Sequence, residues 1–263
     1  MRRWCAPLFC LALLAGDTPQ APAPQTPAPP PPTAQAVKPV LLELFTSEGS
    51  ANCPPADQQL IRFQKDQPVE GVRIIPLSFH VDIWDAFGWK DPFASPLFTQ
   101  RQQAYNVFFE DASAYTPELV VDGAFSLVGS LEQQALTAIE RMARNPKVEL
   151  LIRKDGKDLT VTVPDSTGAK GSGKFEVWLA IAEDGLENDV KKGENAGQKL
   201  AHTGVVRSLQ LLGAIEVGQT SFSATAKPNL AYAWKKENLR AVAWMQAVGN
   251  RHVLGVAEIR LKD

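Results

Sequence analysis

Two nearly continuous apolar runs constrain the fold of this chain most. Val40–Phe45 reads VLLELF and Val72–Val81 reads VRIIPLSFHV. Runs of this kind are typical of strands that are buried on both faces of a sheet, because helices cover both sides. Between them, Ala56, Leu60 and Phe63 are spaced at i, i+4 and i+7, which predicts a helix. The chain is therefore expected to begin its folded part as a layered α/β domain.

The segments that follow extend this domain. Leu97–Phe109 has helical spacing, and two short strands are expected at Glu118–Val121 and Ala124–Val128 around the Asp122-Gly123 turn. A further amphipathic helix is expected from Leu131 onwards. This order of strands and helices predicts an α/β domain with a mixed sheet over residues 38–146.

The pattern changes after Asn145-Pro146, where short strand-like segments alternate with polar turns. The pattern predicts an all-β, sandwich-like second domain over residues 147–263. The expected strands are Lys147–Arg153, Leu159–Val163, Phe175–Ala182, Gly204–Leu211, Thr220–Ala226, Leu239–Gln246 and Val253–Leu261.

The N-terminal segment has the pattern of a targeting signal. Arg2 and Arg3 precede the uncharged run Trp4–Ala15, which is shorter than the roughly 20 apolar residues of a membrane-spanning helix. We expect a signal peptide over residues 1–16, with an uncleaved anchor as the alternative. A proline- and alanine-rich disordered linker is expected over residues 17–37. The mature protein is then periplasmic or secreted, without a membrane span.

Charge and cysteine content narrow the possible functions. The formal net charge of −2 lacks the basic excess that is expected of a nucleic-acid binder. Of the three cysteines, Cys5 and Cys10 fall in the expected signal peptide, so Cys53 is left alone. An intramolecular disulfide is therefore excluded in the mature chain, although exported proteins often contain them.

Four segments together resemble a thioredoxin-like secreted family, domain of unknown function 1223. They are Leu42–Asp57 (LELFTSEGSANCPPAD), Ser78–Pro96 (SFHVDIWDAFGWKDPFASP), Tyr115–Gly123 (YTPELVVDG) and Gly193–Arg207 (GENAGQKLAHTGVVR). The resemblance covers nearly all of the chain after the linker. It implies a thioredoxin-like N-terminal α/β domain, followed here by the sandwich-like domain.

The chain departs from the family pattern at one position. The family usually carries Gly-Cys-x-x-Cys-Pro-Pro-Ala-Asp, whereas Ser50 replaces the first cysteine here and Cys53 is the second. Because the first cysteine is normally the attacking thiolate, dithiol–disulfide cycling within one chain is excluded. Whether the protein is an enzyme therefore stays open.

Cys53 has two possible roles. It lies at a helix N-terminus, where unsatisfied N–H groups favour the thiolate, and Ser50 is placed to donate a hydrogen bond to it. Alternatively, it is buried and inert. The resemblance also implies that Thr116-Pro117 is a cis-proline segment facing Cys53, whose backbone pairs with an extended substrate.

His80, Asp82 and Trp84 follow the second apolar run. His80 is a candidate base toward Cys53, with Asp82 orienting it. The alternatives are a metal site with Cys53 and structural hydrogen bonds to the loop, and we expect no metal and no cofactor. The Trp and Phe residues from Trp84 to Phe98, Trp84 among them, are candidate walls of a peptide groove, with a loop packed on the domain as the alternative. His202 is expected to serve loop architecture.

Two functions remain in competition. The first is single-cysteine thiol redox, in which Cys53 forms mixed disulfides with envelope proteins or small thiols. The second is a non-catalytic envelope binding protein that has lost the first cysteine. Metal carriage is a third, weaker alternative.

Overall fold

The computed structural model describes residues 1, 4, 37–110, 114–169 and 173–262. The chain divides into two units, Met1–Gln35 and Ala36–Asp263. The expected signal peptide and linker lie outside the described residues, apart from Met1, Trp4 and Val37. Within the described ranges, no helix has the length and apolar character needed to cross a membrane.

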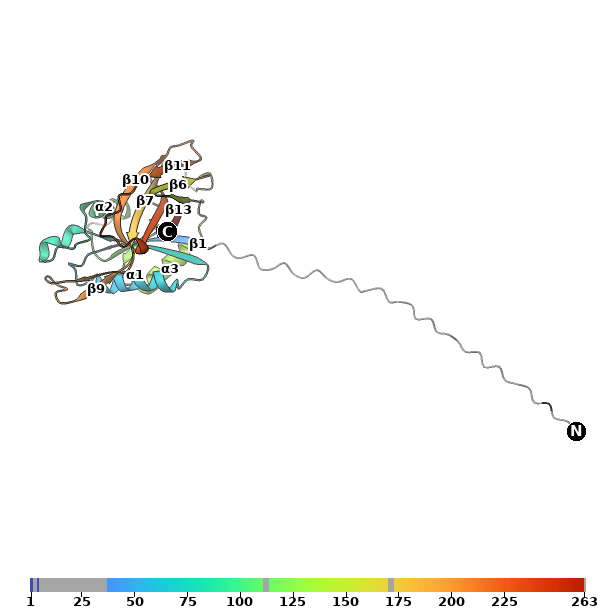
Figure 1. Cartoon of the computed structure of the whole chain (residues 1–263), viewed down its shortest axis with the longest axis horizontal. Coiled ribbons are helices and arrows are strands. Elements are labelled where there is room, and N and C mark those ends of the chain that lie inside the picture. The colour runs from blue at the N-terminus through green and yellow to red at the C-terminus, as the bar shows by residue number, and fades with distance from the viewer. Residues whose placement is uncertain (2–3, 5–36, 111–113, 170–172, 263) are drawn as a thin grey trace. The chain divides into compact units, whose positions relative to one another are not determined.

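The larger unit is built on one eight-stranded mixed sheet (Figure 1) with the order β13-β12-β7-β10-β2-β1-β3-β4. Its strands are β1 Lys38–Thr46, β2 Val72–His80, β3 Glu118–Val121, β4 Phe125–Val128, β7 Phe175–Glu183, β10 Val205–Ile215, β12 Leu239–Ala247 and β13 Val253–Arg260. The smaller sheets are β5 Leu151–Asp155 with β6 Asp158–Val163 and β11 Phe222–Ala226, and the hairpin of β8 Leu186–Asp189 with β9 Lys199–His202. The helices are α1 Pro54–Asp66, α2 Pro96–Phe109 and α3 Glu132–Ala143, with short 3₁₀ turns η1 Asp82–Phe87 and η2 Lys236–Asn238.

Strand β1 is buried on both faces of the sheet, as its continuous apolar run predicts. Leu41 and Phe45 point into a core that includes residues of α2. Leu42 and Leu44 point the other way, into a core formed with α1 and α3. β1 pairs with β2 in parallel and with β3 in antiparallel register, so helices are needed on both sides.

The expectation of two separate domains, one thioredoxin-like and one a β-sandwich, is wrong. The strands of the second half belong to the same sheet as those of the first half. β10 pairs with β2 of the first half on one side and with β7 on the other. The α2 core is shared as well: Leu41 and Phe79 from the first half pack with Ala180, Val242 and Trp244 from the second. The opposite face of β7 and β12 is covered by the sheet β11-β6-β5.

A buried polar network also crosses the expected boundary. Arg101 of α2 donates to Glu43 of β1 through Nε at 2.5 Å and Nη2 at 3.0 Å. Gln246 of β12 donates to the hydroxyl of Tyr105 at 2.7 Å. Because a buried charge is tolerated only when it is paired and hydrogen-bonded, these contacts fix α2 between the two halves of the sheet.

Candidate functional site

Cys53 is the N-cap residue of α1, as the sequence predicts, and it is fully buried. Pro54 and Pro55 occupy the first helical turn, where an N–H group has no helical partner. The sulfur accepts a hydrogen bond from the Ser47 N–H at 3.4 Å. Burial raises the pKa of the Cys53 thiol, and the nearby charge of Asp57 adds to the increase. The surroundings therefore favour the neutral thiol over the reactive thiolate.

Ser50 does not assist this thiol in the way the sequence suggested. Its side chain is buried, and its Oγ has no hydrogen-bond partner among the described residues. Its carbonyl accepts from the Cys53 N–H at 3.2 Å and thereby closes the turn before α1. The position of the family's first cysteine is thus as inaccessible as Cys53.

The Thr116-Pro117 segment lies beside Cys53, and its peptide bond is cis. Thr116 is buried, and hydrogen bonding from its side chain opposes the rise in the pKa of Cys53 without reversing it. Trp84 donates from Nε1 to the Thr116 Oγ1 at 2.8 Å. Trp84 is thus tied to the cis-proline segment beside Cys53, and it is itself only half-buried.

His80 is paired with Asp91, whereas Asp82, its partner in the sequence-based hypothesis, is bound to Thr99. The His80 Nδ1 lies 2.7 Å from Asp91 Oδ2, with both side chains fully buried. Asp82 instead accepts from the Thr99 hydroxyl at 2.5 Å. Burial disfavours the charged imidazole, but the carboxylate of Asp91 outweighs it and the pKa of His80 is raised. Burial likewise opposes the charge of Asp91, but His80 holds the pKa of this carboxyl below its usual range.

His202 belongs to the same cluster, which the sequence analysis missed. Its ring centroid is 4.8 Å from that of His80, and its Nε2 lies 3.0 Å from Glu48 Oε1. Asp57 lies on its other side, with Oδ2 3.8 Å from Nδ1. Burial raises the pKa of Asp57, although the charges of His202 and His80 oppose this. The likeness of Gly193–Arg207 to a family motif was the one signal in the sequence that pointed here.

The β8–β9 hairpin is bonded to the loop between β1 and α1, residues 47–53, which we call the cysteine loop. Asn195 Nδ2 donates to the carbonyls of Glu48 at 2.9 Å and of Ser50 at 3.0 Å. Asn188 donates to Glu48 Oε2 at 2.8 Å, and the Ala51 N–H donates to Glu194 at 2.8 Å. We call this set of contacts the hairpin clamp. It places polar groups of the second half of the chain directly over the residues that precede Cys53.

Most unpartnered buried polar atoms of the described residues gather in this cluster. They are Thr46 Oγ1, Ser50 Oγ, both carboxylate oxygens of Asp57, Ser78 Oγ, His80 Nε2 and His202 Nδ1. Among the residues that the structure describes, no three His, Cys, Asp or Glu side chains are arranged to hold a metal ion. The cluster has acid–base groups, but all of them are enclosed.

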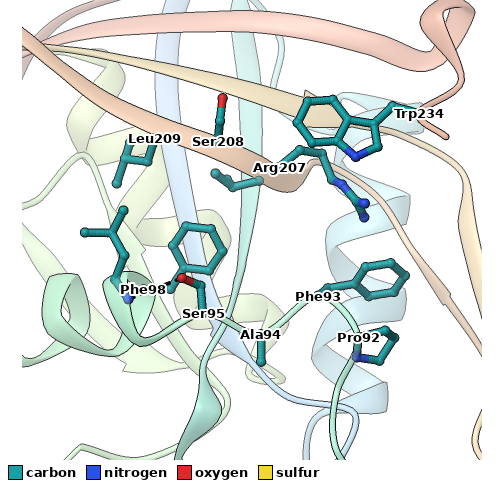
Figure 2. Close-up of a pocket in the computed structure, with 11 residues that line it drawn as sticks. Pro92, Phe93, Ala94, Ser95, Phe98, Arg207, Ser208, Leu209 and Trp234 are labelled. Atoms are coloured by element: carbon teal, nitrogen blue, oxygen red, sulfur yellow. Dashed lines mark hydrogen bonds between the residues drawn. The ribbon is translucent and has the colours of Figure 1, made fainter. Parts of the chain in front are cut away.

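An accessible cavity lies elsewhere, between the segment before α2 and the start of β10 (Figure 2). Its volume is about 250 Å³. We call it the Arg207 groove, and it is lined by Pro92, Phe93, Ala94, Ser95, Leu97, Phe98, Val206, Arg207, Ser208, Leu209 and Trp234. The guanidinium of Arg207 lies between two aromatic rings, 5.3 Å from the centroids of both Phe93 and Trp234. Phe93 and Phe98 belong to the aromatic run that the sequence offers as a groove lining, whereas Arg207 and Trp234 were not predicted.

Comparisons with known proteins identify a family and a fold. The family described as protein of unknown function (DUF1223) matches residues 41–246. No curated protein matches the chain. A crystal structure of an Agrobacterium tumefaciens protein is similar with a TM-score of 0.69 and 24% identity, over 88% of this chain and 97% of the other. The structure of HBP35 of Porphyromonas gingivalis is similar with a TM-score of 0.59 and 13% identity, over 85% of this chain and 75% of the other. At these identities the likeness concerns the fold alone.

Proposed function

Because this chain belongs to the DUF1223 family, whose description names no activity, we propose a function from its own geometry. The protein is an exported, non-catalytic binding protein that takes up an envelope partner in the Arg207 groove. Export is proposed from Arg2, Arg3 and the apolar run that follows them. In this proposal Cys53 has a structural role.

The enclosure of Cys53 supports the absence of thiol catalysis. A catalytic cysteine needs thiolate character and contact with its substrate. Cys53 has no exposed surface, and burial and Asp57 raise its pKa. Single-cysteine redox stays a prediction that would first require the hairpin clamp to open.

One observation carries the binding role: the half-buried Arg207 in an accessible groove with aromatic walls. Arginine and tryptophan are enriched among the residues that dominate binding energies, because each combines a large contact area with directed polar groups. Arg207 and Trp234 both line the groove beside Phe93. A partner that excludes water here gains cation–π and charge-assisted contacts together.

Photo-crosslinking in the envelope of the producing cells tests this proposal. A benzoylphenylalanine placed at Trp234 is expected to capture a discrete partner, and Arg207→Gln in the same chain is expected to abolish the adduct. The matched control carries the crosslinker at Val128, an exposed residue of β4 outside the groove. Equal adducts at both positions, or an adduct that is indifferent to Arg207, would contradict the proposal.

A further inference from the structure

The edge of β10 that faces the Arg207 groove is largely unpaired. β10 pairs with β7 along its whole length. On its other side, the one pair recorded among the described residues joins Val205 to Ser78 of β2. In an antiparallel pair, alternate residues direct their N–H and C=O groups away from the partner strand. Such an edge is a template for an added strand.

One end of this edge is closed. β2 runs parallel to β10 and occupies the position next to Val205. A strand added beside Ser208 and the residues after it therefore cannot continue past Val205. An antiparallel strand would end there with its C-terminus, and a parallel strand would begin there with its N-terminus.

Arg207 lies at this closed end, and its charge favours the antiparallel direction of an added strand over the parallel one. In the pairing of β10 with β7, Val206 and Ser208 have partners on consecutive residues of β7, so Arg207 is the extra residue of a β-bulge. Bulges of this kind redirect side chains. Figure 2 shows its side chain reaching from β10 into the space between Trp234 and Phe93. A positive guanidinium attracts a C-terminal carboxylate and repels an N-terminal amine.

The charge of Arg207 is incompletely compensated inside the protein. Its Nε lies 3.6 Å from the carboxylate of Glu183, which is beyond hydrogen-bond distance. Burial lowers the pKa of Arg207, against the opposing charge of Glu183. Within the described residues its side chain makes no hydrogen bond, so the Nη donors are available for a bidentate carboxylate.

The size of the groove favours binding of one end of a longer ligand over enclosure of a whole small molecule. Pockets that enclose a whole drug-sized ligand typically measure about 300–1,000 Å³, whereas this one measures about 250 Å³. Phe98, Leu97 and Leu209 supply an apolar lining next to the Arg207 site. This space suits the apolar side chain of a terminal residue.

We infer that the Arg207 groove binds the free C-terminus of an extended peptide, which adds to β10 as an antiparallel strand and places its terminal carboxylate on Arg207. This inference rests on the proposed binding function and names its ligand class. Backbone hydrogen bonds to β10 supply affinity, and the groove selects an apolar last residue.

The test uses N-acetylated hexapeptides with randomised C-terminal residues, each made as a free acid and as a C-terminal amide. Peptides selected on the mature protein are titrated by fluorescence polarisation. Free acids are expected to bind about tenfold or more tightly than their amides, the effect of losing a hydrogen-bonded charge. Arg207→Gln is expected to remove this difference, while Arg153→Gln, at an exposed residue of β5, keeps it. N-methylation of alternate peptide amides is expected to abolish binding.

The other outcomes overturn the inference. Equal binding of acids and amides would exclude the C-terminal carboxylate, and a requirement for an internal Asp or Glu would assign the contact to a side chain instead. Binding that tolerates N-methylation would exclude strand addition, and failure to select any peptide would exclude this ligand class. Melting curves confirm that both Arg variants are folded. The proposed function stands separately if the Trp234 crosslink persists when peptides fail.

Discussion

The sulfur of Cys53 accepts a hydrogen bond from the Ser47 N–H, interacts with the Thr116 side chain and is fully buried. A helix N-terminus lowers the pKa of a cysteine thiol when its N–H groups or nearby positive charges stabilise the thiolate. In this protein the desolvation of the thiol and the charge of Asp57 act in the opposite direction. The sequence places Cys53 correctly at the start of α1, but its surroundings include Thr116, a residue 63 positions later whose approach sequence spacing does not report.

We predict that native Cys53 is alkylated by iodoacetamide far more slowly than the same residue in urea-unfolded protein. Burial removes access, and the raised pKa reduces the thiolate fraction at neutral pH. Mass spectrometry of the alkylated protein over time measures both rates. A native rate equal to the unfolded rate at pH 7 would show that the thiol is open and would revive the redox hypothesis.

The His80–Asp91 pair predicts a pH dependence of stability. The folded-state pKa of His80 is raised, so its stabilising contribution is complete below the unfolded value of about 6.5 and is lost as the pH rises through the folded value. We therefore expect the melting temperature to fall as the pH rises above about 6.5. Asp91→Asn should flatten this fall and lower stability by about 3–5 kcal/mol, the usual cost of leaving a buried charge without its partner.

Asp82→Asn is the matched control for this measurement. Asp82 is hydrogen-bonded to Thr99 rather than to His80, so its removal should leave the pH dependence unchanged. If Asp82→Asn flattened the curve and Asp91→Asn did not, the assignment of the His80 partner would be wrong.

Among the elements, the β8–β9 hairpin is the one that the sequence did not predict. Its segment is rich in charged residues and glycine, and its two strands are only four residues each, so no apolar alternation marks them. The seven longer strands of the second half were predicted within a few residues, and in β6 the expected alternation of buried and half-buried residues is present. The hairpin carries both Asn195, in its turn, and His202, the last residue of β9, which explains why the hairpin clamp was not predicted either.

Loosening the hairpin clamp should expose Cys53. Asn195→Ala removes two hydrogen bonds to the carbonyls of Glu48 and Ser50 and is expected to lower stability by about 1–3 kcal/mol. Alkylation of Cys53 should accelerate in this variant. Lys199→Ala, which removes an exposed ion pair on β9, is the control and should change neither quantity. An unchanged alkylation rate in Asn195→Ala would mean that the clamp does not cover the thiol.

At the scale of the whole molecule, periodicity reported which residues are buried but not which sheet they join. Ala180 and Val242 are ordinary inward-facing residues of a sandwich strand when seen in sequence. In the structure they face α2 together with Leu41 of β1, across the domain boundary that was expected at Asn145-Pro146. A helix end followed by short strands is compatible with a second domain and equally with a sheet that continues from the first half. Only the pairing of β10 with β2 shows that the sheet continues.

The shared α2 core predicts that residues 37–262 unfold as one cooperative unit. Calorimetry of the mature protein should give a single transition with equal calorimetric and van't Hoff enthalpies. A separate fragment of residues 38–146 should fail to fold, because the faces of β1 and β2 toward Trp244 would be exposed. Two resolved transitions, or a folded fragment with cooperative melting, would support separate domains instead.

The most direct test of the binding account is the dissociation constant of the partner captured at Trp234, measured by calorimetry for the wild type, Cys53→Ala and Arg207→Gln. The account predicts that Cys53→Ala binds like the wild type, and that Arg207→Gln binds about tenfold more weakly or worse, as expected for the loss of a charge-assisted contact. Loss of binding in Cys53→Ala together with full binding in Arg207→Gln would contradict it and would place the function at the thiol.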